Sequence, residues 1–137
     1  DAALVIDRAG RSAGPATVDV GDRLPLHSTA VGKVLLASAP DELPARLVAG
    51  GLGAATRYTA TVPQVLAADL GRVRDTGIAR EREEYRYGRY GVALGVPGPT
   101  GNISAAVGII GAGAVDEGAW VGLLKDAIAT VTYSIMR

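Results

Sequence analysis

Apolar residues recur at two spacings along the chain, and each spacing predicts a different kind of element. Short β-branched or apolar runs bounded by turn residues predict strands, here at residues 3–7, 17–20 and 78–82. Apolar residues three and four positions apart predict helices. We expect helices over residues 29–37, 40–50, 61–77 and 115–137.

The clearest local signal is a β-hairpin near the C-terminal half of the chain. Two apolar strands, residues 92–96 and 103–110, are joined by a short segment rich in Pro and Gly, which is typical of a hairpin turn. Strands therefore pair as hairpins, and helices do not alternate strictly with them. The expected fold class is α+β, a central antiparallel sheet flanked by helices.

The pattern also predicts helix ends and buried helix faces. Ser28 or Thr29 can cap the helix that follows, residues 61–64 match a capping box, and Gly77 is a natural C-terminal stop. The buried faces are expected at Val62, Val65, Leu66, Leu70 and Val73, and, in a last helix that covers one face of the sheet, at Trp120, Leu124, Ala127, Ile128, Val131 and Ile135.

Composition excludes several classes of protein. A length of 137 residues suits one domain, and 14 basic against 14 acidic residues gives no charge excess that would favour nucleic acid or anionic lipid. The absence of Cys removes disulfides and thiolate chemistry, and one His leaves only carboxylates for a metal. The glycine-rich segments match no complete nucleotide-binding fingerprint. We therefore expect no metal and no cofactor.

The ends of the chain carry little information on targeting. No apolar run is long enough to span a bilayer, and the N-terminus lacks the layout of a signal peptide. No membrane partner is expected. Because the chain begins at Asp1 rather than Met, we expect it to be part of a longer protein.

The start of the first helix is one candidate site for an anion. Free backbone N–H groups and the positive end of the helix dipole favour a carboxylate there, held by the amides near Thr29, Ala30 and Val31. The alternative interpretation is that Ser28 and Thr29 only cap the helix. Residue spacing alone does not choose between the two.

Side chains of one parity share one face of a sheet, and this places several glycines together. Gly108 and Ile110 share a face of one strand, and Arg89, Gly91 and Ala93 share a face of its expected partner. If both sets point the same way, the glycines either leave a hollow or make room for a closely packed helix.

The charged run between the predicted strands has two interpretations. Mixed Glu and Arg residues usually form a solvated edge that contributes little to stability, here Arg80, Glu81, Arg82, Glu83, Glu84, Arg86 and Arg89. Tyr85, Tyr87 and Tyr90 within it can instead form the rim of a polar cavity. His27 lacks a partner at catalytic spacing, so an anchoring role is expected.

Four segments together resemble a known family. Residues 24–37 read LPLHSTAVGKVLLA, and residues 77–84, 91–97 and 103–111 follow in order. This set is similar to the effector-binding domain of the IclR family of bacterial transcriptional regulators. The resemblance implies a GAF-like domain that binds small carboxylic or aromatic metabolites and is not an enzyme. It implies a cytoplasmic homodimer or homotetramer that contacts DNA only through a winged helix-turn-helix domain, which precedes this domain in the family and is absent from this chain.

The resemblance also implies a ligand pocket. Its lining would be Leu24, the backbone amides of Ala30 and Val31, Glu81, Arg89, Gly91, Gly108 and Ile110. Family members often carry Cys near position 91 and small hydroxyl residues near 108 and 110, so a glyoxylate- or pyruvate-like ligand is disfavoured here. Fewer donors and more volume favour a larger, aromatic acid. The alternatives are a hydrolase or isomerase with Glu81, Glu83 or Glu84 as base, and a ligand-free dimerisation module.

Overall fold

A computed structural model describes residues 1–11, 13–113 and 115–136, with the side chains of residues 135 and 136 excepted. The elements follow in the order β1 (Ala3–Leu4), a 3-10 turn η1 (Gly14–Ala16), β2 (Arg23–Leu24), α1 (Ala30–Ser38), α2 (Glu42–Ala49), α3 (Pro63–Thr76), β3 (Ile78–Arg82), β4 (Arg89–Pro97), β5 (Ile103–Ala112) and α4 (Glu117–Met136). The fold is α+β, as expected, with a GAF-like antiparallel sheet and flanking helices.

The central sheet has the strand order β3-β4-β5, and both pairs are antiparallel. The predicted hairpin is confirmed, and its strands are longer than the apolar runs because β4 begins at Arg89 and β5 ends at Ala112. The turn is closed by the Gly98 amide, which donates to the carbonyl of Asn102 at 2.8 Å. Gly101 has a φ of 83°, a left-handed conformation that glycine adopts without strain.

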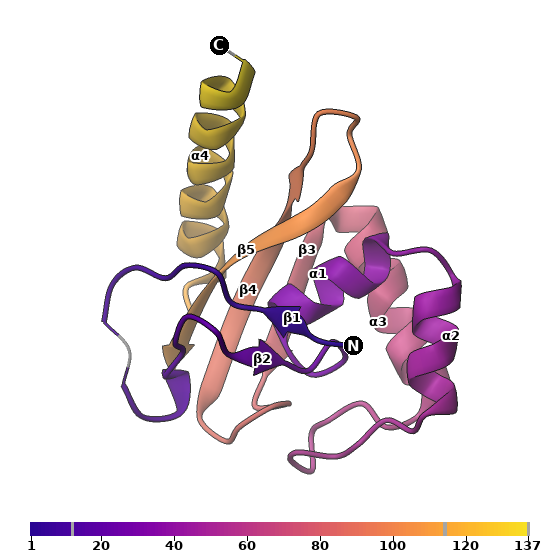
Figure 1. Cartoon of the computed structure of the whole chain (residues 1–137). Coiled ribbons are helices and arrows are strands. Elements are labelled where there is room, and N and C mark those ends of the chain that lie inside the picture. The colour runs from indigo at the N-terminus through magenta and orange to yellow at the C-terminus, as the bar shows by residue number, and fades with distance from the viewer. Residues whose placement is uncertain (12, 114, 137) are drawn as a thin grey trace.

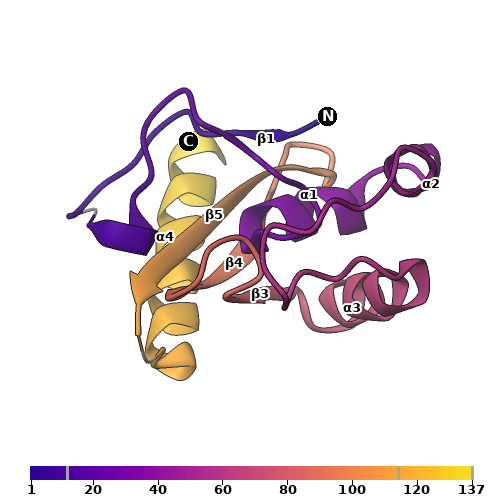
Figure 2. The same ribbon diagram turned by 90° about the horizontal axis from the view of Figure 1, so that it is seen from below.

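Two helices cover opposite faces of this sheet, as Figures 1 and 2 show. α1 packs on the face that holds Ala79 and Ala93, and its core continues to α3 through Leu66 and Leu70. α4 packs on the other face in a separate apolar cluster. One layer of strands thus separates two apolar clusters: Ala93 of β4 belongs to the α1 cluster, and Val92 and Leu94 belong to the α4 cluster, as strand alternation requires.

The start of α1 follows the expected pattern. Thr29 is the N-cap residue, and its hydroxyl accepts a hydrogen bond from the Gly32 amide at 3.2 Å and donates to the Pro25 carbonyl at 2.6 Å. A Cβ at Gly32 would lie 2.5 Å from the Pro25 oxygen, so the incoming loop requires glycine there. Thr29, rather than Ser28, therefore fixes where the loop becomes a helix.

α3 ends as predicted but begins differently. Gly77 terminates it in the left-handed region, with φ 75° and an amide that donates to the Val73 carbonyl. No side chain caps the other end, where Val62 is the N-cap residue, so the predicted capping box is wrong. Val62 and Val65 are half exposed, because Val62 precedes the first turn and Val65 lies about 100° around the helix from Leu66.

α4 covers the sheet with fewer residues than the periodicity predicts. Trp120, Val121, Leu124 and Ile128 pack on the sheet, whereas Ala127 and Val131 are exposed. The side chain of Ile135 lies outside the described residues. A Cβ at Gly111 would lie 2.8 Å from the Trp120 ring, so this glycine admits the indole.

The N-terminal segment contains less strand than predicted. Within residues 3–7 only Ala3 and Leu4 form a strand, paired with β2, and residues 17–20 form none. The reason is local, because Asp22 accepts a hydrogen bond from the Asp19 amide at 2.9 Å through its carboxylate and so closes a turn. No helix in the described part of the chain is long and apolar enough to cross a membrane.

Candidate functional site

The structure brings the eight predicted pocket residues to the α1 side of the sheet. Register pairs Glu81 with Gly91 and Gly91 with Ile110, and it places Gly108 beside Ala93. The two strand faces inferred from parity are therefore one face. Ala30 and Val31 form the first turn of α1 above it, and Leu24 of β2 is buried in the same apolar cluster as Ala30. Their role in binding a ligand remains a prediction.

A buried ion pair lies at the start of α1. The Glu81 carboxylate accepts hydrogen bonds from the Ala30 amide at 3.0 Å and from the Arg89 Nε at 3.0 Å, and Arg89 Nη2 lies 3.4 Å from it. Glu81 is 2% exposed and Arg89 1% exposed. The interpretation of residues 80–89 as a solvated edge is therefore wrong for these two, because strand alternation turns them toward α1.

Donors of Arg89 and of the segment that leads into α1 remain without a partner among the described residues. Among the described residues, Arg89 Nη1 and the Ser28 hydroxyl are buried and have no hydrogen-bond partner. The first α1 amides of Ala30, Gly32 and Lys33 are satisfied, and no hydrogen bond within the described part of the chain reaches the Val31 amide. Buried unsatisfied donors are rare in proteins. Their concentration here marks a place that suits an acceptor.

An aromatic ring borders the same donors. The Arg89 guanidinium lies 5.0 Å from the centroid of the Tyr85 ring, a distance at which a cation interacts with a π face. Of the three tyrosines expected at a rim, Tyr85 alone contacts the ion pair in the described residues. Tyr87 is exposed, and its hydroxyl accepts from the Arg57 amide. Tyr90 has the opposite strand parity from Arg89.

Two groups outside the ion pair have a raised pKa. Burial, and then the negative charge of Glu83, raise the pKa of the Tyr90 phenol above its ordinary value. A hydrogen bond to the Tyr58 hydroxyl raises the pKa of Arg57. Arg57 lies between α2 and α3, and Tyr90 lies on β4 with the opposite parity from Arg89, so neither belongs to the ion pair at the start of α1.

The glycines of this face make room for neighbouring side chains. A Cβ at Gly108 would lie 3.0 Å from Val31 Cγ1 and 3.0 Å from the carbonyl oxygen of Val92. A Cβ at Gly91 would lie 3.0 Å from Glu81 Cγ and 3.1 Å from Ile110 Cγ2. Of the two interpretations left open by the sequence, the close-packing one is therefore favoured.

Gly108→Val is accordingly expected to lower the free energy of unfolding by about 1–3 kcal/mol, because overpacking forces neighbours to shift. Urea denaturation measures the effect. Gly122→Val is the matched control, since nothing lies within 4 Å of a Cβ at Gly122. Equal stability of the two variants would contradict close packing at Gly108.

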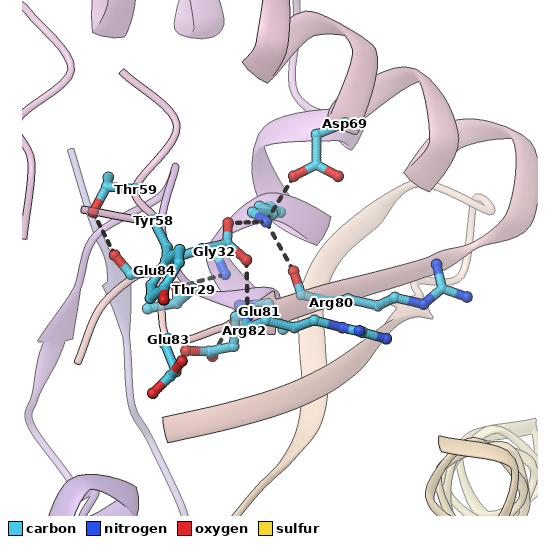
Figure 3. A network of polar contacts seen from close by, with 12 residues as sticks. Thr29, Gly32, Tyr58, Thr59, Asp69, Arg80, Glu81, Arg82, Glu83 and Glu84 are labelled. Atoms are coloured by element: carbon cyan, nitrogen blue, oxygen red, sulfur yellow. Dashed lines mark hydrogen bonds and ion pairs between the residues drawn. The ribbon is translucent and has the colours of Figure 1, made fainter. Parts of the chain in front are cut away.

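The buried ammonium of Lys33, which contacts three elements of the fold, was not among the predicted residues. Its Nζ lies 2.6 Å from Glu84, 2.7 Å from Asp69 and 2.8 Å from the Arg80 carbonyl oxygen, and Lys33 is 1% exposed. Figure 3 shows Asp69, Arg80 and Glu84 around it. The available signal was a lysine within the buried run of α1. The contacts join α1, α3 and β3, and so fix the helix against the strand that carries Glu81.

The turn after β3 is held by a second loop. The Thr56 and Thr59 hydroxyls donate to the carbonyl oxygens of Glu83 and Glu84 at 2.5 and 2.6 Å, and Glu83 has a left-handed φ of 54°. His27 Nε2 lies 2.8 Å from the Gly53 carbonyl oxygen, which fits the anchoring role expected of it. The loop thus fixes the turn that leads from Glu81 to Arg89.

Two cavities among the described residues lie away from this face. One of about 710 Å³ lies between α1, α2 and the start of β5, and another of about 450 Å³ lies between α1, α3 and α4. None of the eight predicted residues lines either. In the described part of the chain, no three His, Asp or Glu side chains gather as a metal site requires.

Comparison with known proteins identifies the family of this α+β domain. Residues 1–130 match the model of the C-terminal domain of the bacterial transcriptional regulator IclR. The chain therefore belongs to the IclR family of transcriptional regulators. Its closeness to individual members can be stated for three proteins.

The HTH-type transcriptional repressor AllR of Escherichia coli strain K12 is 33% identical over 93 residues, which are 67% of this chain and 34% of AllR. The inducer-binding domain of the PobR transcription factor from Acinetobacter, a double mutant in complex with 3-hydroxybenzoic acid, is 26% identical with a TM-score of 0.78, over 90% of this chain and 73% of that one. An IclR homologue from Microbacterium hydrocarbonoxydans in complex with 4-hydroxybenzoate is 25% identical with a TM-score of 0.74, over 81% of this chain and 46% of that one. The chain spans about a third of the length of AllR.

Proposed function

We propose that this chain binds a small aromatic carboxylic acid at the start of α1 and thereby modulates DNA binding by the full-length regulator. The observation that carries the proposal is the buried Arg89, whose Nη1 has no partner among the described residues. A guanidinium binds carboxylates with charge-assisted hydrogen bonds. A buried one with a free donor, next to a helix N-terminus, suits an anionic ligand.

We expect two further donors, at or just before the start of α1, to serve the acid's carboxylate. The Val31 amide is at the positive end of the α1 dipole, where anions are stabilised by about 0.3–1 kcal/mol. The Ser28 hydroxyl is buried without a partner in the described residues. Each hydrogen bond to a charged group contributes about 1.5–3 kcal/mol, so two such bonds give useful affinity.

The body of the ligand would pack against apolar side chains of the same face, which have to move apart because the face is closely packed at Gly91 and Gly108. Tyr85 offers an aromatic ring beside the guanidinium, and Ile110 and Leu24 offer aliphatic surface. Gly91 and Gly108 supply no hydroxyl or thiol donor that would select a two- or three-carbon acid. The hydroxybenzoates bound to the two structural relatives support an aromatic acid.

Regulation would follow from a shift between two arrangements of the regulator. We propose that the full-length protein is a cytoplasmic homodimer or homotetramer and contacts DNA through a winged helix-turn-helix domain that is not part of this chain. The acid stabilises one arrangement by binding it more tightly. The name of AllR as an HTH-type repressor supports such a partner domain.

A thermal-shift panel tests the ligand class. Because a ligand that binds the folded state raises its melting temperature, 3-hydroxybenzoate and 4-hydroxybenzoate are expected to raise Tm by several degrees at about a hundred times Kd. Glyoxylate and pyruvate serve as the small-acid comparison and should have little effect. Stabilisation by the two- and three-carbon acids alone would overturn the proposed ligand class.

The two alternatives predict different results, one in the thermal-shift panel and one by mass spectrometry. A hydrolase or isomerase needs a free base, whereas Glu81 pairs with Arg89, Glu84 pairs with Lys33, and Glu83 accepts from the Gly88 amide. Chemical conversion of an added acid, followed by mass spectrometry, would favour the enzyme. A dimerisation module without a ligand would show no shift with any acid.

A further inference from the structure

We infer that the Glu81 carboxylate is an internal ligand of the anion site, one that an incoming acid must displace. The inference rests on the proposed function and adds a competitor built into the chain. It assigns Glu81 the opposite role from a ligand contact, because removing its charge should strengthen the binding of acids.

The first step is the identity of the groups that hold Glu81. Its two oxygens accept from the Ala30 amide at 3.0 Å and from the Arg89 Nε at 3.0 Å. A helix N-terminal amide and a guanidinium are the donors that a free carboxylate would use at this place. The Glu81 carboxylate thus occupies the donors that would otherwise bind the carboxylate of an acid from solution.

The second step is that the donors exceed what Glu81 can use. In the described residues Arg89 Nη1 has no partner although Arg89 is 1% exposed, and no hydrogen bond reaches the Val31 amide. A purely structural ion pair would satisfy its donors, because a buried unsatisfied group is costly. The site therefore offers one more acceptor position beside the internal carboxylate.

The third step is that two carboxylates cannot share these donors at full strength. A second anion within about 4 Å of Glu81 is repelled in a buried environment. Arg89 is the one cation that contacts Glu81 in the described part of the chain, since Arg80 pairs with Glu117 and Lys33 pairs with Glu84. Binding of an acid must therefore weaken or break the contacts of Glu81.

Two consequences follow for the effector. The internal carboxylate raises the ligand concentration at which the site fills, and it keeps the site closed when no acid is present. An acid that binds must also separate Glu81 from Ala30, so that β3 loses one contact with α1. Occupancy is thereby coupled to the contact between the helix and the sheet.

The experiment is a calorimetric titration of the wild-type chain and Glu81→Gln with 4-hydroxybenzoate. Glutamine keeps the size of the side chain and can still accept from Ala30, but it carries no charge to hold Arg89. We expect Kd to fall by about tenfold in Glu81→Gln, which corresponds to about 1.4 kcal/mol. Glu42→Gln is the matched control, because Glu42 is an exposed residue at the start of α2; its Kd should stay within about twofold of wild type.

Glu81→Asp keeps the charge, and it is the second test variant in case Glu81→Gln does not fold. The aspartate carboxylate is withdrawn by about one C–C bond, roughly 1.5 Å, so both 3.0 Å contacts lengthen beyond hydrogen-bonding range. Its Kd should also fall. Unchanged or weaker binding in the folded Glu81 variants, with normal binding by the wild type, would overturn the inference and leave the proposed function in place. Absence of binding by every variant and the wild type would overturn the proposed function.

Discussion

Lys33→Met is expected to lower the free energy of unfolding by about 3–5 kcal/mol, because it removes the charge that two carboxylates share in a buried place. Lys33 is 1% exposed, and its ammonium lies within 2.7 Å of both Glu84 and Asp69. Methionine fills a similar volume, so the loss is electrostatic rather than steric. The melting temperature should fall by roughly 10 °C.

Urea denaturation of Lys33→Met and of an exposed ion-pair variant checks this expectation. Arg46→Met is the control, since Arg46 pairs with Asp1 at the surface with 65% of its side chain exposed, and surface pairs contribute about 0–1 kcal/mol. Adding Glu84→Gln to Lys33→Met should recover part of the stability. Equal stabilities of Lys33→Met and Arg46→Met would show that the buried contacts of Lys33 do not stabilise the fold.

Arg89→Met is expected to have a double effect, with a similar loss of stability and a loss of acid binding. The buried Glu81 carboxylate would keep the Ala30 amide and lose its cation, which costs about 3–5 kcal/mol. The site would lose the guanidinium on which an acid depends. Thermal unfolding with and without 4-hydroxybenzoate measures both effects, and the ligand-induced rise in Tm should disappear.

Two further variants separate stability from binding. Arg80→Met removes a partly exposed partner of Glu117 on the other face of the sheet, and it should cost about 1 kcal/mol or less and leave binding unchanged. Arg89→Met combined with Glu81→Leu replaces both charges by apolar groups and should be more stable than Arg89→Met alone. A normal ligand shift in Arg89→Met would exclude Arg89 from the site.

Local chemistry allowed much of this fold to be predicted from the sequence. The α1 start follows from a threonine that caps and a glycine that lets Pro25 approach. The hairpin follows from apolar strands around a turn rich in Pro and Gly. Alternation placed Arg89 with Gly91 and, separately, Gly108 with Ile110, and the register of β4 with β5 brings the two sets to one face. Each of these depends on residues close in sequence.

The remaining features depend on contacts between distant residues. Glu81 and Arg89 belong to a charged run that looks like a surface edge, and they are buried because α1 lies over their strand face. Lys33 meets Asp69 and Glu84, which are 36 and 51 positions away along the printed sequence. The periodicity of neighbouring residues in the sequence does not indicate such pairs. For the same reason the glycines could be placed together, but the side chains that fill the space beside them could not be named.

The central claim, that an acid binds between the start of α1 and Arg89, is tested most directly by a crystal structure of this domain grown with 4-hydroxybenzoate. The account predicts the ligand carboxylate within hydrogen-bonding distance, about 3 Å, of Arg89 Nη1 and the Val31 amide, with Glu81 moved away from Ala30. A ligand bound in the cavity between α1, α3 and α4, with the Glu81 contacts to Ala30 and Arg89 intact, would contradict it.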